Sequence, residues 1–244
     1  MPEQERKVVI DADGQKIIFI KRKKITTSSE RIPNNSKMSD VEKFDKITRK
    51  LDSKLNHMLS KWCIDYDSNP CGGIMRATRG SDIETFVRNS INYVGQELQV
   101  NLVAKQGCKD KKELLLQLET KKIVKQHQVD VHIYLDDVFI SVVECKAYLD
   151  SCYYVRACDD FTLFKKFDYS VGNYILTMEN SIDEDTKEFT DAVTNNVCDG
   201  IFCMLDGKRS SSKPIYNRKF FKNHNHTGLK QFLDYIYTLC NTKI

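Results

Sequence analysis

The sequence lacks several patterns that would place a protein in a specialised class. Its nine cysteines form no C-x-x-C pair and are odd in number, which argues against a disulfide framework and against a zinc ribbon. No apolar run approaches the roughly 20 residues that span a bilayer, and the polar start MPEQERK lacks the apolar core of a signal peptide. No G-x-x-x-x-G-K-[ST] motif is present to bind nucleotide phosphates. We therefore expect a cytoplasmic protein with reduced thiols, no membrane contact and no nucleotide cofactor.

The composition is that of a chain that folds. Its 244 residues and hydrophobic share of 41% fit one domain, with or without a small appendage. The net charge of +4 is too small to prove a nucleic-acid partner, but the basic residues are clustered, and such clusters can contact phosphates. Lysine clusters also occur on proteins that bind nothing acidic, so charge supports this partner without deciding it. The candidates for DNA contact are Arg76, Arg79, Lys208, Arg209 and Arg218.

Two stretches precede the main body of the chain. Residues 7–22 hold two β-branched runs around the turn signal Asp11-Ala12-Asp13-Gly14, and they predict a β-hairpin. The polar segment 26–38 is rich in Ser, Asn and Thr and predicts a linker. We therefore divide the chain into a hairpin with linker at 1–38 and a larger domain at 39–244.

Apolar periodicity predicts two helices after the linker. From 39 to 63 the apolar residues recur at three- and four-residue intervals, as on one face of a helix. Segment 65–80 contains a proline and three glycines and predicts a loop. Ser81 then begins a second helix that ends near Gly95, and Glu84 would complete a capping box with Ser81.

The rest of the chain alternates strand and helix patterns. Two β-like runs, 129–135 and 138–145, are separated only by Asp136-Asp137. Beyond them we expect a partly helical stretch at 147–167, strands at 173–178 and 200–205, and helices at 183–193 and 227–241. This order predicts an α/β fold in which helices flank a mixed central β-sheet, with an N-terminal β-hairpin and a C-terminal helix.

Asp130 and the tripeptide Glu144-Cys145-Lys146 fall on the two adjacent β-like runs. Mg²⁺ prefers oxygen ligands, and phosphodiester hydrolysis also needs an activated water and positive charge near the phosphate. Two carboxylates and a lysine on neighbouring strands supply such groups. The acid-x-Lys tripeptide alone is a weak signal, because the chain contains it seven times. The one rival that follows an apolar strand, Asp206-Gly207-Lys208, has its upstream acid Asp199 roughly 23 Å away at about 3.3 Å per residue.

The pairing of these two runs constrains the number of residues in the turn between them. Asp130 and Glu144 share a face only if the loop at Asp136–Val138 has an odd number of residues, and a two-residue turn would put them on opposite faces. We predict the odd loop. The residues then left to pack on the other face are Val131, Ile133, Val143 and Cys145.

The order of an acid, a strand turn and acid-x-Lys resembles the PD-(D/E)xK nuclease superfamily. The Pro of the family name is absent, because Val129 precedes the Asp. The resemblance covers about residues 79–206, and it implies that Asp130 and Glu144 bind Mg²⁺ and that Lys146 positions or activates the attacking water. An ordinary ion pair at a strand end is the alternative for these residues.

Two further residues near this motif have two interpretations each. In several branches of the superfamily, including Holliday-junction resolvases, a Gly-Ser-x-x-Glu segment opens the first core helix and its Glu reaches the metal directly or through water. The resemblance therefore implies Glu84 as a metal ligand, although helix capping alone explains the same residues. His132 would share the face of Asp130, but we expect it to be packed or hydrogen-bonded in the core rather than catalytic.

Within the superfamily, the chain is most similar to a type II restriction endonuclease. Its length is suitable, it carries no helicase or ATPase motif, and it has extra segments at both ends for reading a DNA sequence. This implies double-stranded DNA as the partner and, for a palindromic site, a homodimer. The alternatives are a structure-specific repair or junction-resolving nuclease and a non-catalytic DNA-binding or protein-binding module on the same fold.

Overall fold

The computed structural model describes residues 5–10, 16–21, 40–68, 72–118, 120–167, 171–210 and 212–241. The linker predicted at 26–38, and with it the domain boundary at residue 38, lies outside these residues. For the first two strands and the beginnings of the first two helices, only the backbone is described.

The structure contains strands, α-helices and two short 3-10 helices. The strands are β1 (Glu5–Ile10), β2 (Lys16–Lys21), β3 (Leu102–Gln106), β4 (Lys112–Gln117), β5 (Lys122–His127), β6 (Val131–Leu135), β7 (Val138–Leu149), β8 (Gly172–Asn180) and β9 (Gly200–Cys203). The helices are α1 (Asp40–Ser68), α2 (Gly72–Leu98), η1 (Gly107–Lys109), α3 (Ser151–Lys166), α4 (Glu184–Thr194), η2 (Arg218–Phe220) and α5 (His226–Cys240). None of the helices in the described part of the chain is both long and apolar enough to cross a membrane.

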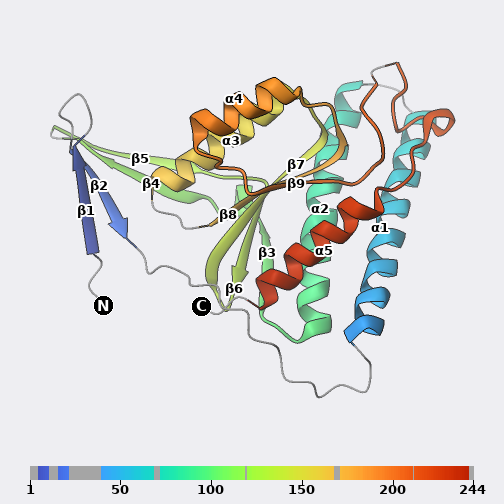
Figure 1. Ribbon diagram of the computed structural model, residues 1–244, viewed down its shortest axis with the longest axis horizontal. Helices are drawn as coiled ribbons and strands as arrows, with labels where there is room; N and C mark the ends of the chain where they lie inside the picture. The colour runs from blue at the N-terminus through green and yellow to red at the C-terminus, as the bar shows by residue number, and fades with distance from the viewer. Residues whose placement is uncertain are drawn as a thin grey trace.

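The centre of the fold is a five-stranded mixed sheet in the order β3-β6-β7-β8-β9. The pairs β3–β6 and β6–β7 are antiparallel, whereas β7–β8 and β8–β9 are parallel. The parallel pairs are joined by α3 and α4, because a parallel connection needs a crossover. In Figure 1, α1, α2 and α5 lie to one side of the sheet, and α3 and α4 lie to the other. The predicted fold class, a mixed central sheet flanked by helices, is confirmed.

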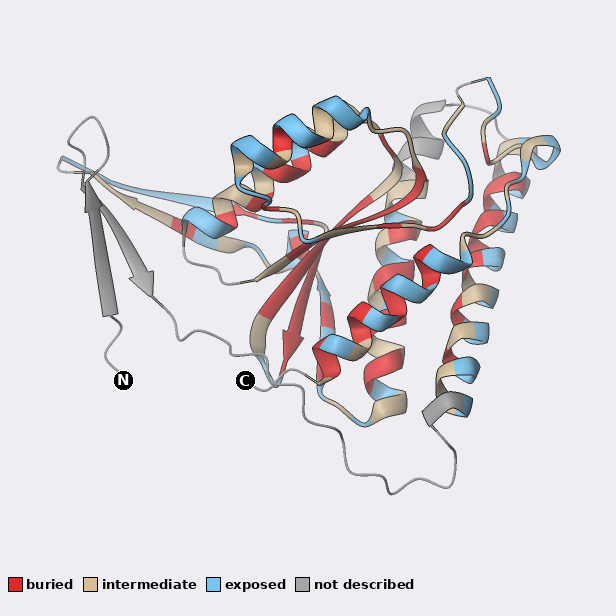
Figure 2. Ribbon diagram, viewed as in Figure 1, coloured by how far each residue is buried: buried red, intermediate tan, exposed pale blue. Residues whose placement is uncertain are grey.

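The core is divided by the sheet into two apolar clusters. Successive residues of a strand point to opposite faces, so Val142 joins the cluster under α3 while Val143 joins the cluster under α1, α2 and α5. The larger cluster is anchored by Trp62 of α1, which is fully buried and donates its indole N–H to Asp82 of α2 at 2.9 Å. Figure 2 shows buried residues along one side of α1 and α5 and exposed residues on the outer side.

Most elements expected from periodicity are present, since α1, α5, β8, α4 and β9 lie within a few residues of their predicted ranges. The N-terminal hairpin is also confirmed by antiparallel pairing of β1 with β2. The cysteines whose surroundings are described, all except Cys71, are free thiols.

The loop predicted at 65–80 is wrong over much of its length. The helix α2 begins at Gly72, so Ser81 lies inside a helix and the capping box with Glu84 does not form. A glycine inside a helix costs only about 1 kcal/mol relative to alanine, and the packing of the buried Ile83, Phe86 and Val87 outweighs that cost.

A second difference is the hairpin formed by β4 and β5. No strand is expected from the sequence between Gln106 and Gln128, where lysines interrupt the apolar alternation. In the structure it pairs in register from Lys112 opposite His127 to Gln117 opposite Lys122.

Candidate active site

Asp130 faces Glu144 across the β6–β7 pair. The ladder pairs Val131 with Val143, which places Asp130, the residue just before β6, opposite Glu144 of β7. The backbone N–H of Cys145 donates to Asp130 Oδ2 at 2.8 Å, and the N–H of Asp130 donates to Glu144 Oε2 at 3.4 Å. The two carboxylates are therefore held together by the strands that carry them.

The turn that joins these strands differs from the prediction. Leu135 pairs with Val138 across a two-residue turn, in which Asp136 and Asp137 have φ of 47° and 63°. Positive φ at both positions is the geometry of the tight type I′ hairpin turn. The odd-membered loop predicted at Asp136–Val138 is therefore wrong.

A β-bulge restores the register that the tight turn would have lost. Tyr134 pairs with Phe139 and Ile133 pairs with Ser141, so Ile140 is left out of the β6 ladder. One extra residue shifts the alternation of all residues beyond it. Ile140 and Ser141 consequently face the same side, where Ser141 Oγ lies 2.7 Å from the hydroxyl of buried Tyr235. Asp130 and Glu144 meet because of this bulge.

The predicted packing face is confirmed. Val131, Ile133, Val143 and Cys145 are buried in the larger apolar cluster. Because this face is fixed by packing, Glu144 and Lys146 must point to the other side of β7.

Lys146 forms an ion pair with both carboxylates of the site. Its Nζ donates to Glu144 Oε1 and lies 4.0 Å from Asp130 Oδ2. All three side chains are largely covered, with exposed fractions of 22% for Lys146, 12% for Glu144 and 29% for Asp130. Burial by itself lowers the pKa of Lys146, but the charges of Glu144 and Asp130 outweigh it and the pKa is raised. Lys146 therefore stays protonated.

One lysine does not neutralise the negative charge of this site. Burial and the neighbouring charge of Glu144 raise the pKa of Asp130 to about 7, although Lys146 and the Cys145 N–H act in the opposite direction. A carboxyl whose ionisation is this unfavourable gains most from a cation at its oxygens. Two covered carboxylates that share a single lysine are a suitable donor set for a hard divalent cation.

Glu84 of α2 lies within electrostatic range of this trio. It accepts a hydrogen bond from Gln106 Nε2 at 3.4 Å, and burial followed by the charge of Glu144 raises its pKa against the opposing effects of Gln106, Arg88 and Lys146. Among the described residues, however, no three His, Cys, Asp or Glu side chains are grouped closely enough to hold a metal ion together. Glu84 is thus near the site and outside the direct contacts of Asp130 and Glu144.

Sequence reasoning missed two residues of α3 that face the site. The ring centroid of Tyr153 lies 5.9 Å from Lys146 Nζ. Burial, and after it the charge of Glu144, raises the pKa of Asp160. The two residues are seven apart and so share one face of α3. Only that spacing is visible in the sequence, which does not show that α3 packs over β7.

Of the five basic candidates for DNA contact, Arg209 has described contacts that lead to the site. Its guanidinium lies 3.3 Å from the ring centroid of Tyr148 and 3.9 Å from the carboxylate of Asp150. Tyr148 follows Lys146 by two residues on β7 and therefore lies on the same face. Its ring is 5.2 Å from that of Tyr153.

The other candidates lie elsewhere or have no described side-chain contact at the site. Arg79 lies 4.3 Å from the ring centroid of Tyr216, and the carbonyl of Lys208 accepts a hydrogen bond from Lys222. The side chain of Arg76 is outside the described residues. His132, expected in the core, is fully buried there and hydrogen-bonded to Asp110.

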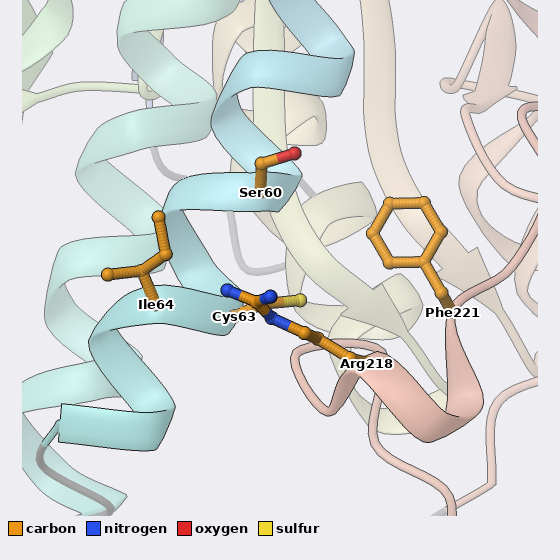
Figure 3. A pocket seen from close by; sticks show the side chains of 5 residues that line it. All are labelled: Ser60, Cys63, Ile64, Arg218 and Phe221. Carbon is orange, nitrogen blue, oxygen red and sulfur yellow. The ribbon is translucent and has the colours of Figure 1, made fainter.

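Arg218 lines a hollow of about 310 Å³ between α1 and η2. Figure 3 shows its side chain extending toward Cys63, and Phe221 lines the same hollow. Arg218 also lies 3.5 Å from the carboxylate of Asp67. It is therefore engaged with α1.

Comparison with known proteins gives one partial sequence match. The chain is 27% identical over 106 residues to the type II restriction enzyme DdeI of Desulfomicrobium norvegicum. The match covers 38% of this chain and 44% of that enzyme, which is less than half the length of the relative. No family model matches the chain.

A comparison with solved structures also gives a match. A chain of the native BbvCI A2B2 tetramer superposes with a TM-score of 0.37 and 8% identity, covering 82% of this chain and 90% of that one. With a mixed sheet that brings Asp130, Glu144 and Lys146 together and a partial sequence match to a type II restriction enzyme, the chain has a restriction-endonuclease-like fold.

Proposed function

We propose that the chain is a magnesium-dependent endonuclease that hydrolyses phosphodiester bonds of double-stranded DNA, as a type II restriction endonuclease does. The observation that carries this proposal is the pair Asp130 and Glu144, held opposite each other with Lys146 between them and short of positive charge. The partial similarity to a type II restriction enzyme supports the same activity.

Asp130 and Glu144 are the residues that would hold Mg²⁺. Mg²⁺ keeps several waters and is commonly bound through one or two carboxylates plus a substrate phosphate. Two carboxylates therefore suffice in this coordination, with waters and the substrate phosphate as the other ligands. When bound, the ion supplies Lewis-acid polarisation of the phosphate and lowers the pKa of a coordinated water.

The protein's own groups have separate roles beside that ion. Lys146, protonated and fixed between the two carboxylates, offers positive charge where the phosphate becomes more negative during attack. Tyr153 limits the movement of the Lys146 ammonium by lying beside it. We assign Glu84 to the same site at longer range, as a carboxylate that acts on the cation through water.

A digestion of phage DNA tests this proposal. The unaltered protein with Mg²⁺ is expected to give discrete bands, and Asp130→Ala and Glu144→Ala are expected to give none. Asp206→Ala is the matched control, because it removes the acid of the rival acid-x-Lys tripeptide, which is exposed, and should cut as the unaltered protein does.

Each other outcome of this digestion has a definite meaning. A smear, or cleavage confined to branched DNA, would replace restriction by a repair or junction-resolving activity. Absence of cleavage by the unaltered protein with Mg²⁺ and Mn²⁺ would overturn the enzymatic proposal and leave a DNA-binding module.

We also propose that the active form is a homodimer, since a two-fold protein matches a palindromic site. Sedimentation of the protein with and without DNA should show two copies per duplex. A single copy on a duplex that is cut in both strands would contradict the dimer.

A further inference from the structure

We propose that the β4–β5 hairpin is an arm that enters a groove of the DNA next to the cleavage site. The arm is defined as residues 112–127, and this inference rests on the proposed nuclease function. Figure 1 shows β4 and β5 leaving the central sheet and projecting past α3 and α4. They form a two-stranded sheet of their own.

The base of the arm is part of the candidate active site. The chain leaves β3 at Gln106, whose amide donates to Glu84, and it returns to the central sheet at Asp130. The N–H of Gly107 donates to the carbonyl of Asp130 at 2.9 Å. A ligand lying along the arm would therefore pass beside the two carboxylates.

The base is also fixed by close approach of the backbone. A Cβ on Gly107 would lie 1.7 Å from the carbonyl oxygen of Val129, which is closer than any side chain can come. Only glycine allows the two ends of the arm to meet here. The arm and Asp130 are thus joined at a point with little freedom.

A partly buried polar cluster adds a second attachment. Asp110 Oδ2 lies 3.0 Å from both His132 Nδ1 and Lys112 Nζ, and it accepts a hydrogen bond from Tyr134. The N–H of Val129 donates to His132 Nε2 at 3.3 Å, so Nε2 carries no proton and Nδ1–H donates to Asp110. These contacts hold the segment just before β4 against β6.

The outer part of the arm is exposed and basic. The β5 residues from Lys122 to Gln126 are all exposed, and so is Lys121 before them. Between Lys109 and Gln128 the chain has six lysines and three acidic residues, a difference of +3. The base cluster engages one of these acids, Asp110, and one of these lysines, Lys112, so the difference among the others is still +3. The charge that faces solvent is therefore suited to a polyanion.

The shape of the arm matches the same ligand. A strand of six residues is about 20 Å long at 3.3 Å per residue, and the major groove of DNA admits a two-stranded β-ribbon. Lys122 and Lys125 of β5 offer contacts to phosphates, and the exposed Val124 and Ile123 offer apolar contacts to base methyl groups.

The alternative binding partner of the arm is a second copy of this chain, paired along the exposed edge of β5. Lysines on an edge strand disfavour such pairing, and two basic arms would repel each other. DNA is therefore the ligand that we assign.

The test compares DNA affinity for three variants, with Ca²⁺ in place of Mg²⁺ to prevent cleavage. In the first, Lys121, Lys122 and Lys125 are replaced by Gln, and we expect binding at least about tenfold weaker, with a salt slope shallower by about three. Replacing the same three lysines by Arg should restore the affinity. In the matched control, exposed Lys46, Lys50 and Lys230 of α1 and α5 are replaced by Gln, with affinity and cleavage expected to remain unchanged.

The outcomes separate this inference from the proposed function. If the Gln variant of the arm and the control bind DNA equally well, while the unaltered protein still cuts DNA, the role of the arm is overturned and the proposed nuclease function stands. Loss of self-association in place of loss of DNA binding would assign the arm to a second copy and overturn the inference. If the unaltered protein neither binds nor cuts DNA, both proposals fail.

Discussion

Asp130 lies opposite Glu144 because Ile140 forms a bulge in β7, and without that extra residue the tight turn at Asp136-Asp137 would send the two carboxylates to opposite faces of the sheet. The bulge therefore links a local irregularity of one strand to the chemistry of the site. β-Bulges commonly redirect side chains beside active sites.

Removal of the bulge should abolish the site. Deletion of Ile140 changes the alternation between the turn and Glu144, so either the carboxylates separate or the apolar face turns to solvent. We expect DNA cleavage to fall below detection and the Tm to fall by several degrees. Ile140→Val keeps the residue count, should cost about 1 kcal/mol and should still cut. Normal cleavage by the deletion variant would contradict the assigned register.

Two glycine substitutions should have opposite effects on stability. Gly107→Ala forces a Cβ into the carbonyl of Val129, and we expect a loss of more than about 2 kcal/mol in the free energy of unfolding. Gly80→Ala lies within α2 with no atom within 4 Å of the new Cβ, so it should gain about 0.5–1 kcal/mol. Urea denaturation measures both, and a neutral Gly107→Ala would show that the arm is not fixed at its base.

The stability of the metal-free protein should depend on Asp130 and pH. The folded pKa of about 7 lies above the ordinary value of 3.8, so the folded state binds a proton that the unfolded state has lost between these two values. Stability that is present below pH 4 is therefore lost as the pH rises through 7. Asp130→Asn, which can still accept from the Cys145 N–H, should be more stable by about 1–3 kcal/mol at pH 8. Thermal unfolding in EDTA measures this, and parallel pH profiles of the two proteins would argue against it.

Arg209 and Tyr148 should contribute to DNA binding as a pair. Arg209→Gln removes the guanidinium that lies over the ring of Tyr148, and with it one positive charge. We expect weaker DNA binding, with a salt slope lower by about one. Tyr148→Phe keeps the ring and should bind as the unaltered protein does, whereas Tyr148→Ala should resemble Arg209→Gln. Equal affinities in all four proteins, measured by fluorescence anisotropy, would exclude the pair from the DNA-binding surface.

The parts of the fold that follow regular apolar periodicity could be predicted from the sequence, as α1 and α5 were. The glycines before Ser81 indicated a loop, because their small local cost is visible and the packing that outweighs it is not. The arm was missed because neither of its faces is deeply buried along most of its length, so no alternating pattern is required.

The residues that meet at the site were predicted from the sequence, but part of the backbone geometry that brings them together was missed. The spacing of Asp130 and Glu144 correctly indicated that they meet, but a bulge and a longer loop both satisfy that requirement, and the sequence does not distinguish them. Tyr153 and Asp160 reach the site only through the packing of α3 on β7, a contact between segments that no local pattern encodes.

The central claim is that Asp130 and Glu144 together hold the cation that drives DNA cleavage. Single-turnover cleavage of one plasmid, measured against Mg²⁺ concentration for the unaltered protein, Asp130→Asn and Glu144→Gln, tests it most directly. Both isosteric variants should lose about 10³-fold in rate at saturating Mg²⁺, because each removes a metal-binding charge worth several kcal/mol to the transition state. A rate within about tenfold of the unaltered protein in either variant, at the same Mg²⁺ dependence, would contradict the assignment.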